Sequence, residues 1–265
     1  MTDSSVPMFF FCGAGAEPPD LDIFSSESSR IEVIRYPGWK RYIDEGFSPE
    51  VFIEELATEI QGKIPCGPLG IIGSSIGAHF GYASALRLQA SGRQIAGFCA
   101  IDSFMAVSSE PSRGWKSRAF AEAWNLLTSF KAREFARFLR SKSWRALCRL
   151  SGDRLPWILQ CFANRLPGAI SYDRILEQEL SMRLLIRQTA TWIASLDLDP
   201  VPLQTPAALL RTAHVATDDA AWRRRCPKIK IFEIPGEHRT IYESQNIQAL
   251  REVFKEATRD WISHR

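Results

Sequence analysis

The pentapeptide Gly73-Ser74-Ser75-Ile76-Gly77 has the G-x-S-x-G pattern of a nucleophile elbow. The apolar run Leu69–Ile72 precedes it and a helix-forming segment follows at once, so the serine is expected in a tight turn between a buried strand and a helix. A side chain at either glycine would collide with the neighbouring strand or helix of such a turn. We therefore predict Ser75 as a nucleophile, with Ser74 as the alternative.

A serine hydroxyl needs a base within hydrogen-bond reach and a third group that orients this base. Histidine is the commonest base, and the sequence has four. We predict His238, because it follows a predicted strand in Pro-Gly-Glu-His, where α/β sheets carry their sites. His79 falls one turn into the helix after Ser75 and is expected to be packed. His214 and His264 are expected to face solvent.

Two positions compete for the orienting acid. Asp102 ends the strand that follows the nucleophile helix, and neighbouring parallel strands end on the same edge of a sheet, so it is expected beside Ser75. Asp218 and Asp219 follow the predicted strand 207–212, a place that many serine hydrolases use, although they could also cap the next helix. We predict Asp102, which gives the chain order Ser…Asp…His known for serine hydrolases of this kind.

Two preorganised N–H groups must bind the oxyanion of a tetrahedral intermediate. The backbone amide of Ile76, at the start of the nucleophile helix, is one candidate. The second is expected from the loop Gly13-Ala14-Gly15, whose small residues permit close approach of a substrate. We favour Ala14, with Gly13 as the alternative. An ordinary glycine-rich turn stays open for this loop, whereas a phosphate-binding loop is disfavoured because the third glycine and the following helix are missing.

The elements that must position these residues follow an α/β order. Apolar runs bounded by turn residues predict strands at 8–12, 31–36, 69–72, 95–101, 207–212 and 229–234. Helical spacing predicts helices from 48 to 60, after Ser75 to about Ala90, and in the last segment to Trp261. No strand is indicated between about 104 and 206, where helices are predicted over 117–130, 131–150, 155–164 and 172–195. We predict one α/β domain, 1–265, with a mostly parallel central sheet, helices on both faces and a helical lid insertion over about 104–206.

The composition is typical of a soluble globular protein, with 265 residues of which 45% are hydrophobic and 24% charged. The six cysteines are scattered without a C-x-x-C pair, which indicates free thiols in a reducing compartment, and no metal site is predicted. The first residues lack a basic region followed by a long apolar one. We therefore expect a cytoplasmic protein without a membrane segment.

Taken together, these residues resemble the thioesterase domains that end non-ribosomal peptide and polyketide synthases in natural-product biosynthesis. The similarity covers nearly the whole chain and lies in 9–15, 67–78, Ala100-Ile101-Asp102-Ser103, 199–211 and Ile234-Pro235-Gly236-Glu237-His238. The position of the acid, Asp102, is similar to that in the chain-terminating thioesterases. Separate editing thioesterases usually carry the acid later, near Asp218 and Asp219 here.

This resemblance implies an α/β-hydrolase fold with Ser75 as nucleophile, Asp102 as orienting acid, His238 as base and a helical lid over an acyl chamber. It also implies an acyl or peptidyl carrier protein as partner, which delivers the acyl chain on phosphopantetheine, and no cofactor of the enzyme itself. The sequence departs from the family at Ser74, where an aromatic residue or histidine is usual. Because no carrier domain precedes residue 1, we expect either a domain excised from a synthase or a stand-alone enzyme.

Charge in the predicted lid fits such a partner. Residues 113–165 contain twelve basic side chains and three acidic ones. Carrier proteins are typically acidic, so this charge is compatible with electrostatic steering. A solvated helix face would have the same composition. Nucleic acid is disfavoured because no binding motif is present. Three other functions stay open: a carboxylester or lipid hydrolase of the same fold, a stand-alone editing thioesterase, and a non-catalytic binding module.

Overall fold

The computed structural model describes residues 6–14, 18–24, 30–103, 154, 157–158, 161, 174–213, 219–238 and 240–261. The chain divides into two compact units, of which one combines residues 1–106 with 181–265 and the other comprises residues 107–180. Every residue that the sequence predicts for the site belongs to the first unit.

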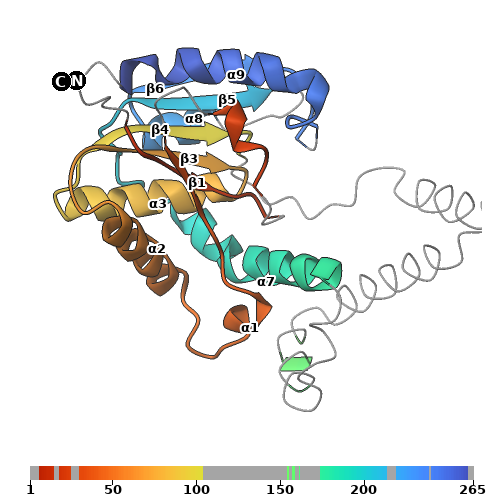
Figure 1. Cartoon of the computed structure of the whole chain (residues 1–265). Coiled ribbons are helices and arrows are strands. Elements are labelled where there is room, and N and C mark those ends of the chain that lie inside the picture. The colour runs from red at the N-terminus through yellow and green to blue at the C-terminus, as the bar shows by residue number, and fades with distance from the viewer. Residues whose placement is uncertain are drawn as a thin grey trace, which may run out of the picture. The chain divides into compact units, whose positions relative to one another are not determined.

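A six-stranded sheet forms the centre of the first unit (Figure 1). Its strands are β1 (Met8–Phe11), β2 (Ile31–Ile34), β3 (Leu69–Ser74), β4 (Ile95–Ile101), β5 (Ala207–Thr212) and β6 (Ile229–Ile234). Their order is β2-β1-β3-β4-β5-β6, and every neighbouring pair is parallel. The predicted strands and the parallel sheet are therefore confirmed.

The described helices are α1 (Trp39–Tyr42), α2 (Pro49–Lys63), α3 (Gly77–Ala90), α7 (Arg174–Ser195), α8 (Asp219–Arg225) and α9 (Ser244–Thr258), with the 3₁₀ turns η1 (Leu21–Ile23) and η3 (Arg259–Trp261). Helix α2 begins as its sequence predicts, because the Ser48 hydroxyl accepts a hydrogen bond from the Val51 amide and Pro49 is the first helical residue. The short elements α1 and η1 were not predicted, since three or four residues are too few to display a helical period.

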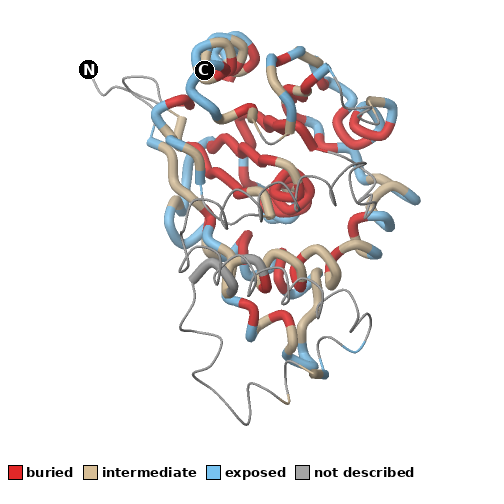
Figure 2. Tube along the Cα trace, turned by 90° about the vertical axis from the view of Figure 1, so that its right-hand side faces the viewer, coloured by how far each residue is buried: buried red, intermediate tan, exposed pale blue. Residues whose placement is uncertain are grey.

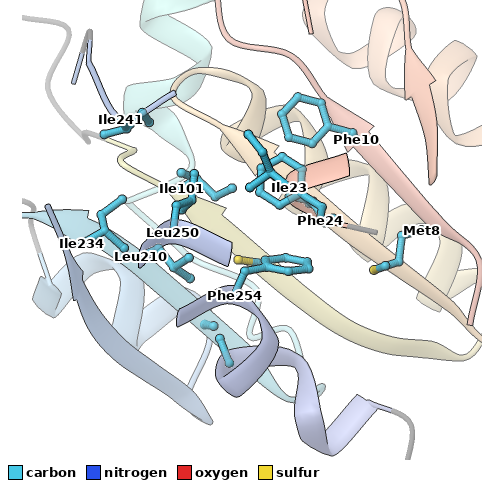
Figure 3. Close-up of a cluster of buried hydrophobic side chains, with 14 of the residues drawn as sticks. Met8, Phe10, Ile23, Phe24, Ile101, Leu210, Ile234, Ile241, Leu250 and Phe254 are labelled. Atoms are coloured by element: carbon cyan, nitrogen blue, oxygen red, sulfur yellow. The ribbon is translucent and has the colours of Figure 1, made fainter. Parts of the chain in front are cut away.

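Helices cover both faces of the sheet, with α2 and α3 on one side and α9 on the other (Figure 1). Strands β3 and β4 are buried along their whole length, as expected for a parallel sheet covered on both faces. Figure 2 shows buried residues mainly in the interior of the trace and exposed ones mainly toward its outside. Beneath α9, Phe10, Ile101 and Leu210 pack with Leu250 and Phe254 in one apolar cluster (Figure 3).

Helix α7 lies within the predicted helix 172–195, and its second half packs in the first unit. Leu184 and Ile193 are buried there, and Trp192 stacks on Phe80 of α3 with ring centroids 5.9 Å apart. The second unit ends at Leu180. The rest of the predicted lid, 104–173, lies outside the described residues except for 154, 157–158 and 161.

None of the helices in the described ranges combines the length and the apolar character that a membrane-spanning segment needs. In the same ranges no three potential metal ligands are grouped. The cysteines that the structure describes are free thiols, namely Cys12, Cys66, Cys99, Cys161 and Cys226.

Candidate active site

Ser75 occupies the turn between β3 and α3, as the elbow pattern predicts. Its backbone has a φ of 53°, in the left-handed region that residues other than glycine rarely adopt. The Ser75 amide donates a hydrogen bond to the Ile101 carbonyl at the end of β4, with N and O 2.8 Å apart. This bond ties the strained turn to the neighbouring strand, so the serine side chain stands at the edge where both strands end.

The two glycines of the elbow are required by close backbone approaches. A Cβ atom at Gly73 would lie 2.4 Å from Cα of Ala78, inside the first turn of α3. A Cβ atom at Gly77 would lie 2.3 Å from the Cys12 carbonyl oxygen, just after β1. Both distances are far shorter than any van der Waals contact, so the G-x-S-x-G spacing is dictated by how strand and helix pack.

The structure brings Ser75, His238 and Asp102 together. Ser75 Oγ lies 3.2 Å from His238 Nε2, and His238 Nδ1 lies 2.7 Å from Asp102 Oδ2. A carboxylate only accepts hydrogen bonds, so His238 Nδ1 carries the proton and Nε2 is left to accept from the serine hydroxyl. This arrangement can remove the Ser75 proton during attack on a carbonyl group.

Asp102 is completely buried and follows β4 with a φ of 46°. Its Oδ1 atom accepts hydrogen bonds from the amide and the hydroxyl of Thr212, both 3.0 Å long, while Oδ2 faces His238. Burial by itself would raise the pKa of the Asp102 carboxyl, but the bonds from His238 and Thr212 outweigh it and lower the pKa below its usual value. The group is therefore ionised near neutral pH.

The other acids and histidines that the sequence offered for the site bind different partners or lie outside the described residues. Asp219 stands in the first turn of α8 and its carboxylate binds the Arg211 guanidinium at 3.0 Å. His79 is buried, as predicted, in α3. Asp218, His214 and His264 lie outside the described residues.

The predicted oxyanion loop lies beside the elbow. A Cβ atom at Gly13 would be 3.5 Å from Cβ of Ser75, and the Tyr36 hydroxyl fixes this loop by donating to the Cys12 carbonyl at 2.9 Å. Within the described part of the chain, neither the Ile76 amide nor the Ala14 amide donates a hydrogen bond to a protein carbonyl. This is what the predicted role of the two N–H groups in binding an oxyanion requires.

Several polar contacts of the site were not predicted. Ser74, which stands where the resemblance implies an aromatic residue or histidine, accepts a hydrogen bond from the Tyr242 hydroxyl at 2.8 Å. Ser103, next to Asp102, donates to the Ser75 carbonyl at 2.8 Å. Thr212 binds Asp102 from β5. These partners are far apart in the sequence, and no local pattern indicates them.

Comparison with protein families gives one match over most of the chain. The family model described as a thioesterase domain matches residues 30–257. No curated protein sequence matches the chain significantly.

Solved thioesterase domains have the same architecture. The Vlm2 thioesterase domain bound with a dodecadepsipeptide has a TM-score of 0.59 at 15% identity, covering 96% of this chain and 93% of that one. The NocB thioesterase domain, in covalent complex with a fluorophosphonate nocardicin G analog, has a TM-score of 0.56 at 11% identity, covering 96% and 95%. The four-domain nonribosomal peptide synthetase AB3403 has a TM-score of 0.56 at 18% identity, covering 96% of this chain and 19% of that one. This likeness confirms the predicted α/β-hydrolase fold.

Proposed function

Because the chain belongs to the thioesterase domain family, we propose that it is a serine thioesterase that works through Ser75. It takes an acyl, peptidyl or polyketide chain from the phosphopantetheine of a carrier protein and releases it by hydrolysis or cyclisation. The observation that carries the proposal is the continuous hydrogen-bonded series from Ser75 Oγ through the His238 ring to Asp102.

In the first half of the reaction, His238 Nε2 takes the Ser75 hydroxyl proton while Oγ forms a bond to the thioester carbonyl carbon. Asp102 holds the ring in the correct tautomer and stabilises the imidazolium that forms. The tetrahedral intermediate then breaks its carbon–sulfur bond. The pantetheine sulfur leaves with the proton from His238, and the acyl group stays on Ser75.

Negative charge develops on the carbonyl oxygen during this attack. The amides of Ile76 and Ala14 bind the oxyanion, with Gly13 as the alternative donor from the same loop. Such preorganised donors contribute about 10²–10³-fold in rate each. The position of Gly13 against Ser75 supports this role of the loop.

In the second half, His238 removes a proton from water or from a hydroxyl or amine of the acyl chain itself. The new nucleophile attacks the Ser75 ester, and the product leaves as a free acid or a ring while Ser75 regains its proton. The reaction uses no cofactor of the enzyme, because the phosphopantetheine arm belongs to the carrier protein and is part of the substrate.

A carrier protein as partner is supported by two observations. The chain matches one part of the four-domain synthetase AB3403, and residues 113–165 carry twelve basic side chains against three acidic ones. Of these residues the structure describes 154, 157–158 and 161, and the stretch supports a carrier partner through its charge.

The proposal is tested by incubating the protein with an acyl-pantetheine thioester and measuring its intact mass and peptide masses. We expect an acyl adduct on Ser75, and none in a Ser75→Ala variant whose melting temperature is within a few degrees of the wild type. Ser74→Ala serves as the matched control, because it removes the neighbouring hydroxyl and should still acylate. No adduct on Ser75 would contradict the proposal. Faster turnover of simple oxygen esters than of the thioester would favour an ester or lipid hydrolase instead.

A further inference from the structure

A second series of buried polar groups contacts Ser75 at its backbone carbonyl. Ser103 is fully buried, and its Oγ atom lies 2.8 Å from the Ser75 carbonyl oxygen and 3.3 Å from His79 Nε2. The indole N–H of Trp222 donates to the Ser103 carbonyl at 3.3 Å. Ser103 is therefore held through both its main chain and its side chain.

The series continues from His79 to the end of α7. His79 Nδ1 lies 2.8 Å from Nη1 of Arg225, whose guanidinium binds the Asp197 carboxylate at 2.9 Å and 3.0 Å. The Arg225 side chain has no exposed surface, and its guanidinium lies over the rings of Tyr82 and Trp222, 5.3 Å and 5.4 Å from the centroids. A charge buried to this extent requires such partners to offset its lost hydration.

The direction of every hydrogen bond in this series follows from the chemistry of arginine. A guanidinium can only donate, so His79 Nδ1 accepts and carries no proton. His79 Nε2 then bears the ring proton and donates it to Ser103 Oγ. With that acceptor position occupied, the Ser103 hydroxyl proton is directed at the Ser75 carbonyl.

The hydrogen bond to the Ser75 carbonyl also affects the Ile76 amide, because the two groups share one peptide unit. The Ser75 carbonyl and the Ile76 amide belong to one peptide unit, and in a planar trans peptide C=O and N–H point in opposite directions. A donor that fixes the carbonyl therefore also fixes where the amide points. Hydrogen bonding at the carbonyl further polarises the N–H group and makes it a better donor.

We propose that Ser103 is a positioning residue for the oxyanion hole, which orients the Ile76 amide through the Ser75–Ile76 peptide, and that His79, Arg225 and Asp197 hold Ser103 in place. This inference rests on the proposed role of the Ile76 amide. One other described group holds the same carbonyl, the Ala78 amide at 3.1 Å. Removal of the Ser103 hydroxyl thus leaves one of the two described contacts to this carbonyl, at a residue whose strained φ of 53° persists only where its surroundings hold it.

The test compares Ser103→Ala, which removes the hydroxyl, with Ser103→Thr, which keeps it. We expect Ser103→Ala to lower kcat for acyl-pantetheine hydrolysis about tenfold, less than the loss of a whole oxyanion donor. KM and the pH profile should stay as in the wild type, because His238 and Asp102 are untouched. Ser103→Thr should restore most of kcat. A general loss of packing would instead lower activity in both variants.

A second readout separates this inference from the choice of substrate. The rate at which a fluorophosphonate probe labels Ser75 also depends on the oxyanion hole and requires no thioester. If the wild type is labelled but does not turn over the thioester, the proposed function fails, while slower labelling of Ser103→Ala still supports the positioning role. Wild-type labelling and wild-type kcat in Ser103→Ala would overturn it, and so would a wild type that is not labelled at all.

The proton direction is measured on the unaltered protein by ¹⁵N NMR of the histidine rings. We expect His79 to carry its proton on Nε2, and a proton on Nδ1 would overturn the series. Should Ser103→Ala fail to fold, His79→Gln is the replacement variant. It leaves the Ser103 hydroxyl in place but removes the ring that directs it, so labelling of Ser75 should slow by less than tenfold. An unchanged rate would count against the proposal.

Discussion

At the scale of single residues, the two rival acids differ in what their carboxylates bind. Asp102 is buried against His238 and Thr212, whereas Asp219 pairs with Arg211 on a partly exposed surface. We expect Asp102→Asn to lower kcat about 10³–10⁴-fold, because an asparagine cannot hold the His238 tautomer that accepts the serine proton. Steady-state thioester hydrolysis measures the effect.

Asp219→Asn is the matched control for this substitution. It removes a carboxylate of the same size, and the lost ion pair is worth at most about 1 kcal/mol at a partly exposed site. Its kcat should equal that of the wild type. A large loss in Asp219→Asn together with a small one in Asp102→Asn would place the acid after β5 instead.

Asp102 should also make stability depend on pH in the acid range. Its pKa is lowered in the folded protein, so the ionised form stabilises the fold above the ordinary pKa of 3.8 and loses this effect as the pH falls through the lowered pKa. Urea unfolding of the wild type and Asp102→Asn should give a constant difference in free energy near neutral pH. That difference should shrink below 3.8, and an increase on acidification would contradict the assignment.

The residues that could be predicted from the sequence share one property: each stands at a strand end with a local pattern around it. Ser75 and His238 follow β3 and β6, and Asp102 follows β4. Their supporting partners could not be predicted. Tyr242 reaches Ser74 across 168 positions and Arg225 reaches His79 across 146, and a hydrogen bond at such a separation leaves no periodicity in either segment.

At the scale of elements, the turn from β3 to α3 depends on a missing side chain. Gly73→Ala would put a methyl group 2.4 Å from the Ala78 Cα atom, which must push α3 away from the strand. We expect the free energy of unfolding to fall by about 1–3 kcal/mol or more, and Ser75 labelling by a fluorophosphonate to slow with it. Chemical denaturation and labelling kinetics measure the two effects.

Gly62→Ala is the matched control, for which we expect a small gain in stability instead of a loss. Gly62 lies in α2, and a Cβ atom there meets nothing within 4 Å. An alanine in a helix is favoured over glycine by about 0.5–1 kcal/mol, so this variant should be slightly more stable and fully active. Equal destabilisation by both substitutions would show that the close approach at Gly73 is not the cause.

The elements themselves could be predicted where their pattern was long enough. Six strands and the helices α2, α3, α7 and α9 follow from apolar runs and helical spacing, but α1 has only four residues. The predicted lid bounds, about 104–206, stay a prediction, because helical spacing identifies a helix without saying what covers it. Side chains such as Leu184 and Trp192 pack in the first unit.

At the scale of the whole molecule, the basic stretch 113–165 should make recognition of a carrier protein depend on salt. Steering by charge weakens as the ionic strength rises. We expect KM for an acyl group on an acidic carrier protein to rise about tenfold between low and high salt. KM for the same acyl group on free pantetheine, the matched control, should change little. Equal salt dependence of the two substrates would contradict steering by this stretch.

On one side of the sheet the order of the strands in space is the same as their order in the chain. Strands β3, β4, β5 and β6 are neighbours in the order in which they are synthesised. If the chain folds as it is made, each new strand can therefore pair with the strand made just before it. Ser75 and Asp102 emerge early, but His238 follows the outermost strand. Under the proposed function, a nascent chain therefore carries Ser75 without its base until residue 238 has been made.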